Sequence, residues 1–262
     1  MILLTNGDSW TQGDSPSQTL NWNATKTLDW YDIVPHFGNA LMSPDNRIFK
    51  SEKNTRISYK FYDSEVWPKV LGRKLGLKTW NSGRLGADNR KIVETTVYSV
   101  KYLQDLGHKD IFVVVGWTSM FRQKTFVLKT REDGSSFITN DTLRPTEMDK
   151  SLILKDQHYT SHFLHDILYL QSFLESQNIK YLFFNAFDYV QPKNDQALNY
   201  INVNNWYGKC LDKGHMKQYI LDENNLEEWN DQKWFIGSHP SDLGHILWGN
   251  HLGDYIKDNN VV

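Results

Sequence analysis

The sequence predicts an α/β fold, a three-layer α/β/α sandwich with a parallel sheet as its middle layer. Short apolar runs alternate along the chain with longer segments whose apolar residues recur at helical spacing. This alternation is typical of parallel strands joined by helices that cover both faces of the sheet. The 262 residues contain no internal repeat, so we expect one domain over residues 1–262.

Four apolar runs are expected to form the strands of the sheet, and they lie at residues 2–5, 77–80, 111–115 and 181–184. Helical spacing predicts helices over about residues 64–71, 88–106 and 160–177, and another near the C-terminus that includes His245. Ser64 is the expected N-cap of the first helix, because its hydroxyl can accept a hydrogen bond from an N–H of the first turn.

Two long segments interrupt the alternation, at about residues 11–63 and 117–157. The first is rich in Asn, Ser and Thr and has little periodicity. The second contains the runs Phe126–Lys129 and Ser136–Thr139 on either side of an Asp-Gly pair, which predicts a hairpin. Both segments leave the carboxyl ends of strands, where open α/β sheets bind ligands, so we expect them to form the walls of a binding cleft.

The composition argues against several kinds of partner. Twenty-nine basic and 31 acidic residues give a formal net charge of −2, so we expect no nucleic-acid partner and no membrane partner. The single cysteine, Cys210, excludes a disulfide within the chain. Neither a long apolar run nor a signal peptide occurs, which favours a cytoplasmic protein or one released without a secretion signal. The sequence does not specify an oligomeric state.

Aromatic residues make up 14% of the chain, and ten of them are tryptophans. Several tryptophans lie in polar surroundings outside the expected strands and helices, namely Trp22, Trp30, Trp206 and Trp229. Two interpretations stay open for them. They are suited to stack on sugar rings, and equally suited to pack long loops onto the body of the domain.

The motif Gly7-Asp8-Ser9 follows the first expected strand directly. A hydroxyl at the carboxyl end of a strand lies where substrates reach an open α/β sheet, so Ser9 is a candidate nucleophile. A second Gly-Asp-Ser at residues 13–15 lies in a polar segment before a proline and is typical of a plain turn.

Near the other end of the chain, His239 is followed by Pro240 in a short loop. A neutral serine hydroxyl is barely ionised near neutral pH and needs a base to act as a nucleophile. A histidine that a proline holds in a loop can be that base. The two ends of the chain are therefore expected to meet.

With these motifs the sequence resembles the SGNH (GDSL-like) hydrolase family, which is named for four residues carried in four separate blocks. The second block corresponds to residues 80–90, where Gly86 falls on the family's oxyanion glycine and Gly83 is a rival. The third block follows residues 111–115 and has Thr118 where the family has an asparagine. The resemblance covers nearly the whole chain and implies the flavodoxin-like parallel sheet of the SGNH hydrolase fold.

The third block departs from the family pattern. A threonine hydroxyl donates one hydrogen bond where an asparagine amide offers two. We therefore expect an oxyanion hole that combines the Thr118 hydroxyl with the backbone N–H groups of Ser9 and Gly86.

The last block departs as well, because Ile236 replaces the aspartate of the family's Asp-x-x-His-Pro. His245 follows Asp242 at the spacing Asp-x-x-His and competes with His239 as the base. We prefer His239, since His-Pro marks the catalytic loop in the resemblance. The group that orients His239 is left open between a backbone carbonyl and a carboxylate, with Asp231 and Asp222 as the candidates.

The resemblance implies a serine esterase that needs no cofactor. In this interpretation Ser9 attacks the acyl carbon and His239 transfers the proton. The residues expected to contact substrate are Asp8, which also fixes the turn, together with Trp10, Trp117 and Arg122. Polar insertions without an apolar stripe favour an acyl ester, above all an O-acetyl ester, on a carbohydrate or glycoconjugate. Two alternatives are a non-catalytic carbohydrate-binding protein on the same fold and an O-acyltransferase.

A metal site is a further alternative. His158, His162 and His165 recur at helical spacing next to Asp166, as in half of a zinc site. The apolar residues of the same segment take the core face, and no familiar metal-binding motif occurs. We therefore expect no metal.

Overall fold

Four parallel strands form the main sheet, in the order β2-β1-β3-β6. The structure is a computed structural model, and it describes residues 1–12, 65–84, 86–130, 136–143, 156–187, 195–211, 215–228, 231, 233–236 and 239–262. The strands are β1 (Ile2–Asn6), β2 (Lys78–Asn81), β3 (Ile111–Trp117) and β6 (Lys180–Asn185). All pairings within the sheet are parallel, which confirms the predicted α/β fold class.

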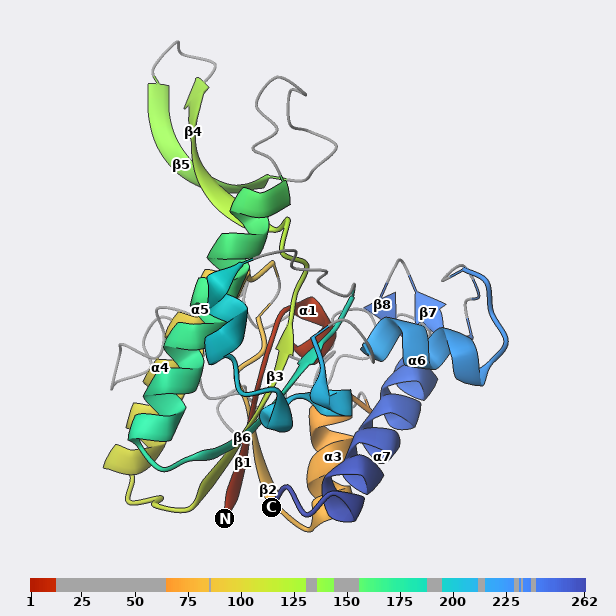
Figure 1. Cartoon of the computed structure of the whole chain (residues 1–262). Coiled ribbons are helices and arrows are strands. Elements are labelled where there is room, and N and C mark those ends of the chain that lie inside the picture. The colour runs from red at the N-terminus through yellow and green to blue at the C-terminus, as the bar shows by residue number, and fades with distance from the viewer. Residues whose placement is uncertain are drawn as a thin grey trace, which may run out of the picture.

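Helices cover both faces of this sheet (Figure 1). One face carries α4 (Asn89–Asp105) and α5 (Asp156–Ser176), and the other carries α3 (Trp67–Leu75), α6 (Met216–Glu223) and α7 (Asp242–Asp258). Side chains of a strand alternate between the two faces. In β3, Val113 and Val115 therefore pack on the α4 side, whereas Phe112 and Val114 pack on the α3 side. This double burial explains why the β3 run is continuously apolar.

The predicted hairpin is present as the antiparallel strands β4 (Gln123–Thr130) and β5 (Ser136–Leu143). Figure 1 shows it projecting beyond the end of the sheet at which α1 (Ser9–Gln12) lies. The Asp-Gly pair, within residues 131–135, and residues 144–155 of the second insertion lie outside the described residues, as does the first insertion beyond residue 12.

Several boundaries differ from the prediction. The helix expected to begin at Ser64, which lies outside the described residues, begins at Trp67, and Val66 is in the N-cap position without a side-chain cap. Pro68 explains this start, since proline fits the first turn of a helix, where no N–H partner is needed. β3 continues for two residues beyond its predicted end and so includes Trp117.

Several short elements were not predicted, because their apolar residues do not recur at helical or strand spacing. They are α6, the 3₁₀ helices η6 (Gln196–Tyr200), η7 (Val203–Asn205) and η8 (Tyr207–Lys209), and the two-residue strands β7 (Phe235–Ile236) and β8 (His239–Pro240). In this region Trp206 is 1% exposed and packs edge-on against Phe183. Trp206 is therefore a core residue, while the other three tryptophans considered for sugar stacking lie outside the described residues.

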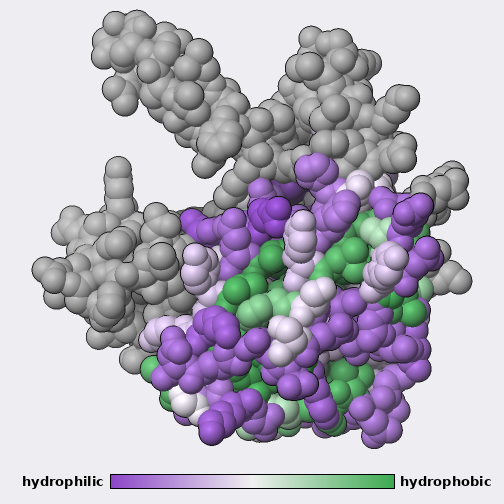
Figure 2. Space-filling model, turned by 60° about the vertical axis from the view of Figure 1, so that its left-hand side comes forward, coloured by the Kyte–Doolittle hydropathy of each residue, from purple (hydrophilic) through white to green (hydrophobic). Residues whose placement is uncertain are grey.

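On the face shown in Figure 2, hydrophilic residues predominate among the described ones, and hydrophobic areas lie between them. No helix within the described residues combines the length and the apolar character that a membrane crossing requires.

Candidate active site

The turn after β1 places Ser9 at the carboxyl end of the sheet. Gly7 is needed there, because a Cβ atom on it would lie 2.1 Å from Thr11 Oγ1 and 2.7 Å from the backbone oxygen of Gly116. The Asp8 carboxylate accepts the N–H of Trp10 at 3.0 Å, and the Asp8 carbonyl accepts the N–H of Thr11 at 3.0 Å. Asp8 thus holds the first turn of α1, and Ser9 is the first residue of that helix.

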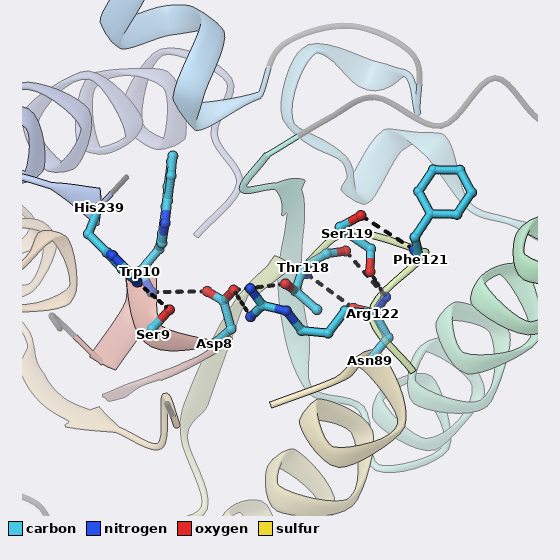
Figure 3. Close-up of polar contacts among 9 residues, drawn as sticks. All are labelled: Asp8, Ser9, Trp10, Asn89, Thr118, Ser119, Phe121, Arg122 and His239. Atoms are coloured by element: carbon cyan, nitrogen blue, oxygen red, sulfur yellow. Dashed lines mark hydrogen bonds and ion pairs between the residues drawn. The ribbon is translucent and has the colours of Figure 1, made fainter. Parts of the chain in front are cut away.

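His239 Nε2 lies 2.9 Å from Ser9 Oγ (Figure 3). The contact joins residues 230 positions apart in the chain. β8 holds the histidine, since His239 pairs with Ile236 and Pro240 pairs with Phe235. Ser9 is buried and His239 is partly exposed, so the pair lies just below the surface. The predicted meeting of the two ends of the chain is present, and the catalytic roles of the two residues stay predictions.

The Asp8 carboxylate lies in a network at the ends of β1 and β3. Its second oxygen accepts hydrogen bonds from Thr118 Oγ1 at 2.8 Å and from Arg122 Nη1 at 2.7 Å. Asp8 is fully buried. Desolvation therefore raises the pKa of Asp8, while the charge of Arg122 and the hydrogen bond from Thr118 act in the opposite direction. The burial and these contacts agree with the predicted role of Asp8 in fixing the turn, and a contact with substrate stays a prediction.

Thr118 is fixed through its backbone as well. The side-chain amide of Asn89 accepts the Thr118 N–H at 3.1 Å and donates to the Thr118 carbonyl at 3.2 Å. Asn89 is the first residue of α4, and Asp88 caps that helix by accepting the N–H of Lys91 at 2.8 Å. Asn89 was not among the predicted site residues. The sequence feature that could have identified Asn89 is its position, because it is an amide residue at the start of a helix, shortly after Gly83 and Gly86.

The Thr118 hydroxyl has one hydrogen to donate, and in this structure it donates that hydrogen to Asp8. This arrangement differs from the oxyanion role that we expected for Thr118. The side chain links β3 to the turn that carries Ser9, so its observed contacts are those of a positioning residue.

Arg122 reaches Asp8 from a tight turn after β3, which the Arg122 N–H closes by donating to the Ser119 carbonyl at 3.0 Å. Phe121 in this turn packs edge-on against Tyr159 of α5. The guanidinium lies over the ring of Phe187, 5.5 Å from its centroid, and the side chain stays 28% exposed. Arg122 is the predicted substrate contact that keeps both exposed surface and a position beside Asp8.

The two candidate oxyanion glycines have different surroundings. Gly83 is buried, and its N–H donates to the side-chain oxygen of Asn81 at 3.0 Å. Gly86 is partly exposed, and its φ of +67° lies in the left-handed region that favours glycine. Its N–H has no hydrogen-bond partner among the described residues. These differences favour Gly86 as the backbone donor.

The two tryptophans predicted to contact substrate are fully buried. Trp117 packs edge-on against Phe163 and Phe183, because β3 continues through residue 117 and directs this side chain to the α5 face. The structure therefore does not support Trp117 as a substrate contact, and that role stays an untested prediction. Trp10 packs 4.2 Å from the ring of Phe187, so it supports the ring beneath Arg122 and presents no surface of its own.

His245, the competitor of His239, lies inside α7 with no exposed surface. Its Nδ1 atom accepts the N–H of Trp67 at 3.3 Å, and its Nε2 atom is buried without a hydrogen-bond partner among the described residues. Desolvation, and to a lesser degree the charge of His239, lowers the pKa of His245 to about 3. These surroundings favour a neutral core histidine.

Stability should therefore depend on His245 at acidic pH. Its pKa is lower in the folded chain than in the unfolded chain, so the unfolded state binds the extra proton between pH 6.5 and about 3. The free energy of unfolding should fall by about 1.4 kcal/mol per pH unit in this window as the pH is lowered. His245→Gln should remove much of that slope in urea titrations, and His108→Gln, at an exposed histidine, should not. Equal slopes in the two variants would contradict the assignment.

The carboxylates considered for orienting His239 have other contacts. Asp231 accepts the N–H of Lys233 at 2.8 Å and so forms a turn. Asp222 lies exposed on α6 and accepts from the side chain of Gln218 at 2.6 Å. Neither of these hydrogen bonds is with His239 or Ser9.

The residues considered as half of a zinc site lie on α5. His162 and His165 are exposed, and Asp166 pairs with Arg90 of α4 at 3.3 Å. Within the described residues, no group of three or more His, Cys, Asp or Glu side chains has a geometry that could hold a metal ion.

Replacing Thr118 with valine tests the positioning role. Valine has nearly the same shape but no hydroxyl, so the buried Asp8 carboxylate loses one of its donors. We expect the free energy of unfolding to fall by about 1–3 kcal/mol, whereas Thr118→Ser, which keeps the donor, should lose less. Chemical denaturation of the three proteins measures this difference. A valine variant as stable as the wild type would show that the bond to Asp8 adds nothing.

The described residues define an α/β protein in which a serine and a histidine meet at the carboxyl edge of a parallel sheet. The chain belongs to DUF6071, a protein family of unknown function, and the match covers residues 49–262. No curated protein matches the chain. A solved structure of a protein assigned to the lipolytic G-D-S-L family, from Desulfitobacterium hafniense DCB-2, is similar with a TM-score of 0.38 and 12% identity, over 97% of this chain and 98% of that chain. A likeness of this size does not assign a function.

Proposed function

We propose that this protein is a serine esterase that cleaves a small acyl ester. The observation that carries the proposal is the 2.9 Å contact between Ser9 Oγ and His239 Nε2 at the carboxyl end of β1. A hydroxyl within hydrogen-bond reach of an imidazole is the arrangement that a serine nucleophile requires. The G-D-S turn and the His-Pro loop that supply the two groups support the same class of chemistry.

In the proposed reaction, Ser9 Oγ attacks the acyl carbon while its proton passes to His239 Nε2. The tetrahedral intermediate collapses when the bond to the alcohol oxygen breaks, and His239 gives its proton to that oxygen. Water then attacks the acyl carbon and loses a proton to His239. The bond to Ser9 Oγ breaks and the oxygen regains its proton from His239, which releases the carboxylic acid.

We propose that the acyl group is short. The serine is only 2% exposed, which favours acetyl over a long acyl chain. Our proposal for the alcohol component is a carbohydrate or glycoconjugate hydroxyl. This proposal is based on the polar composition of the two insertions. It does not rest on sugar stacking by tryptophan, because Trp206, the one described tryptophan considered for that role, is a core residue.

The proposal is tested with the wild-type protein and two probes. A fluorophosphonate should label Ser9, as peptide mass spectrometry can show, and p-nitrophenyl acetate should be hydrolysed faster than p-nitrophenyl octanoate. Mass spectrometry of acetylated oligosaccharides should then show loss of acetyl groups. Transfer of the acetyl group to a second sugar in place of water would identify an acyltransferase. If Ser9 is not labelled and no ester is cleaved, the protein is not a serine esterase.

A further inference from the structure

The oxyanion of the proposed reaction needs donors beside Ser9, and Thr118 does not supply one. The Thr118 hydroxyl donates its hydrogen to Asp8, and the Thr118 N–H donates to Asn89. Both donors of this residue are therefore engaged. The backbone N–H groups near Ser9 and Gly86 are left, without the side-chain donor expected at this place.

A second donor lies beside the Thr118 hydroxyl. Thr118 Oγ1 and Arg122 Nη1 donate to the same carboxylate oxygen of Asp8, so the guanidinium lies next to the Thr118 side chain. Figure 3 shows the guanidinium between Asp8 and Thr118, with Ser9 adjacent to Asp8. A guanidinium carries five N–H groups in one plane, so one bond to Asp8 leaves others that can point to a ligand.

The environment of Arg122 is suited to a fixed donor. The Asp8 carboxylate holds one edge of the guanidinium, and the Phe187 ring lies under its face. A side chain with two such contacts is preorganised, and a preorganised positive charge stabilises a developing oxyanion without reorganisation during the reaction. The remaining exposure of Arg122 lets a substrate oxygen reach it.

We infer that the Arg122 guanidinium supplies the side-chain donor of the oxyanion hole, in the place that Thr118 leaves open. Asp8 then acts as a positioning residue that aims the guanidinium, and Ser9 follows Asp8 directly in the chain. The inference rests on the proposed esterase function. It makes the stabilisation of the oxyanion depend on a positive charge as well as on N–H groups.

A purely structural role for Arg122 predicts a different behaviour. In that case the guanidinium serves only to neutralise the buried Asp8 carboxylate, and removing both charges together should restore activity. If Arg122 is an oxyanion donor, removing both charges restores folding but leaves the reaction slow. The double variant therefore separates the two roles.

The test compares Arg122→Met, Asp8→Asn and the combined variant with the wild type. For hydrolysis of p-nitrophenyl acetate we expect kcat to fall by about 10²–10³-fold in Arg122→Met with little change in KM. The combined variant, which buries no unpaired charge, should stay equally slow. Asp8→Asn keeps Arg122 and should lose less. Fluorophosphonate labelling of Ser9 should slow in parallel with kcat, because the phosphonyl oxygen takes the place of the oxyanion.

The chain offers a matched control. Arg90 pairs with the buried Asp166 and lies 5.3 Å from the ring centroid of Tyr169, as Arg122 pairs with Asp8 over Phe187, but it is on α4 and its ion pair is with Asp166 of α5 and not with Asp8. Arg90→Met should therefore leave kcat unchanged. Wild-type rates in the combined variant would overturn the inference for Arg122 while the esterase proposal stands. Absence of turnover and labelling in the wild type itself would remove the esterase proposal.

Discussion

Ser9→Ala is expected to reduce ester turnover by about 10⁴-fold or more, because no other group of the site replaces a missing nucleophile. The fold should be retained. Among the described residues, the hydrogen-bond partner of the Ser9 hydroxyl is His239, and removal of the hydroxyl creates only a small void. We expect a change in unfolding free energy of about 1 kcal/mol or less. Initial rates with p-nitrophenyl acetate and urea titrations measure the two quantities.

The matched control for this variant is Ser82→Ala. Ser82 is a buried serine with one side-chain partner, since its hydroxyl lies 2.7 Å from the Ser99 hydroxyl. Its removal should cost a similar amount of stability and leave kcat unchanged. Ser9 is not the nucleophile if the Ser9→Ala protein keeps more than a few per cent of the wild-type rate, or if a fluorophosphonate still labels it.

The main sheet was predictable from the sequence because its strands are buried on both faces. A run such as residues 111–115, apolar at every position, fits a strand between two helical layers, and each of the four predicted runs is a strand of the observed sheet. α4 was predictable because helical spacing and an N-cap aspartate, Asp88, agree on its start. Local sequence and tertiary packing favour the same structure in these segments.

Other elements depend on contacts that are distant in sequence. β7 and β8 have two residues each and are defined by pairing with one another. α6 has few buried residues, and its start is capped by His215, a residue type that sequence rules seldom assign to this position. Propensity is a weak guide to such short elements, since tertiary contacts decide them.

The site was predictable where a residue belongs to a motif. Ser9 and His239 were identified from the residues around them, and the two side chains are in contact. The link from Arg122 to Asp8 spans 114 positions and belongs to no motif. The sequence also could not reveal that Thr118 donates to Asp8, because a hydroxyl's partner depends on which acceptor the fold brings within reach. The burial of Trp117 could not be predicted for a related reason, since the position at which β3 ends decides which face its side chain takes.

His239→Ala is the second variant for which we expect a very large effect. Without the imidazole, Ser9 has no base at 2.9 Å, and the leaving alcohol has no proton donor. We expect kcat to fall by about 10³-fold or more, with little change in KM. Partial recovery on adding imidazole is expected, because alanine leaves a space of that shape beside Ser9.

His245→Gln is the control that distinguishes the two histidines. Glutamine can accept the Trp67 N–H as His245 does. Because His245 is buried in the protein core, on α7, and forms no hydrogen bond with Ser9, the variant should keep most of the wild-type kcat near neutral pH. Fluorophosphonate labelling of Ser9 should follow the same order, slow in His239→Ala and near the wild-type rate in His245→Gln. A loss at His245 equal to or larger than the loss at His239 would reverse the assignment of the base. Because His245 is fully buried, that result would also require Ser9 and α7 to approach each other more closely than they do in this structure.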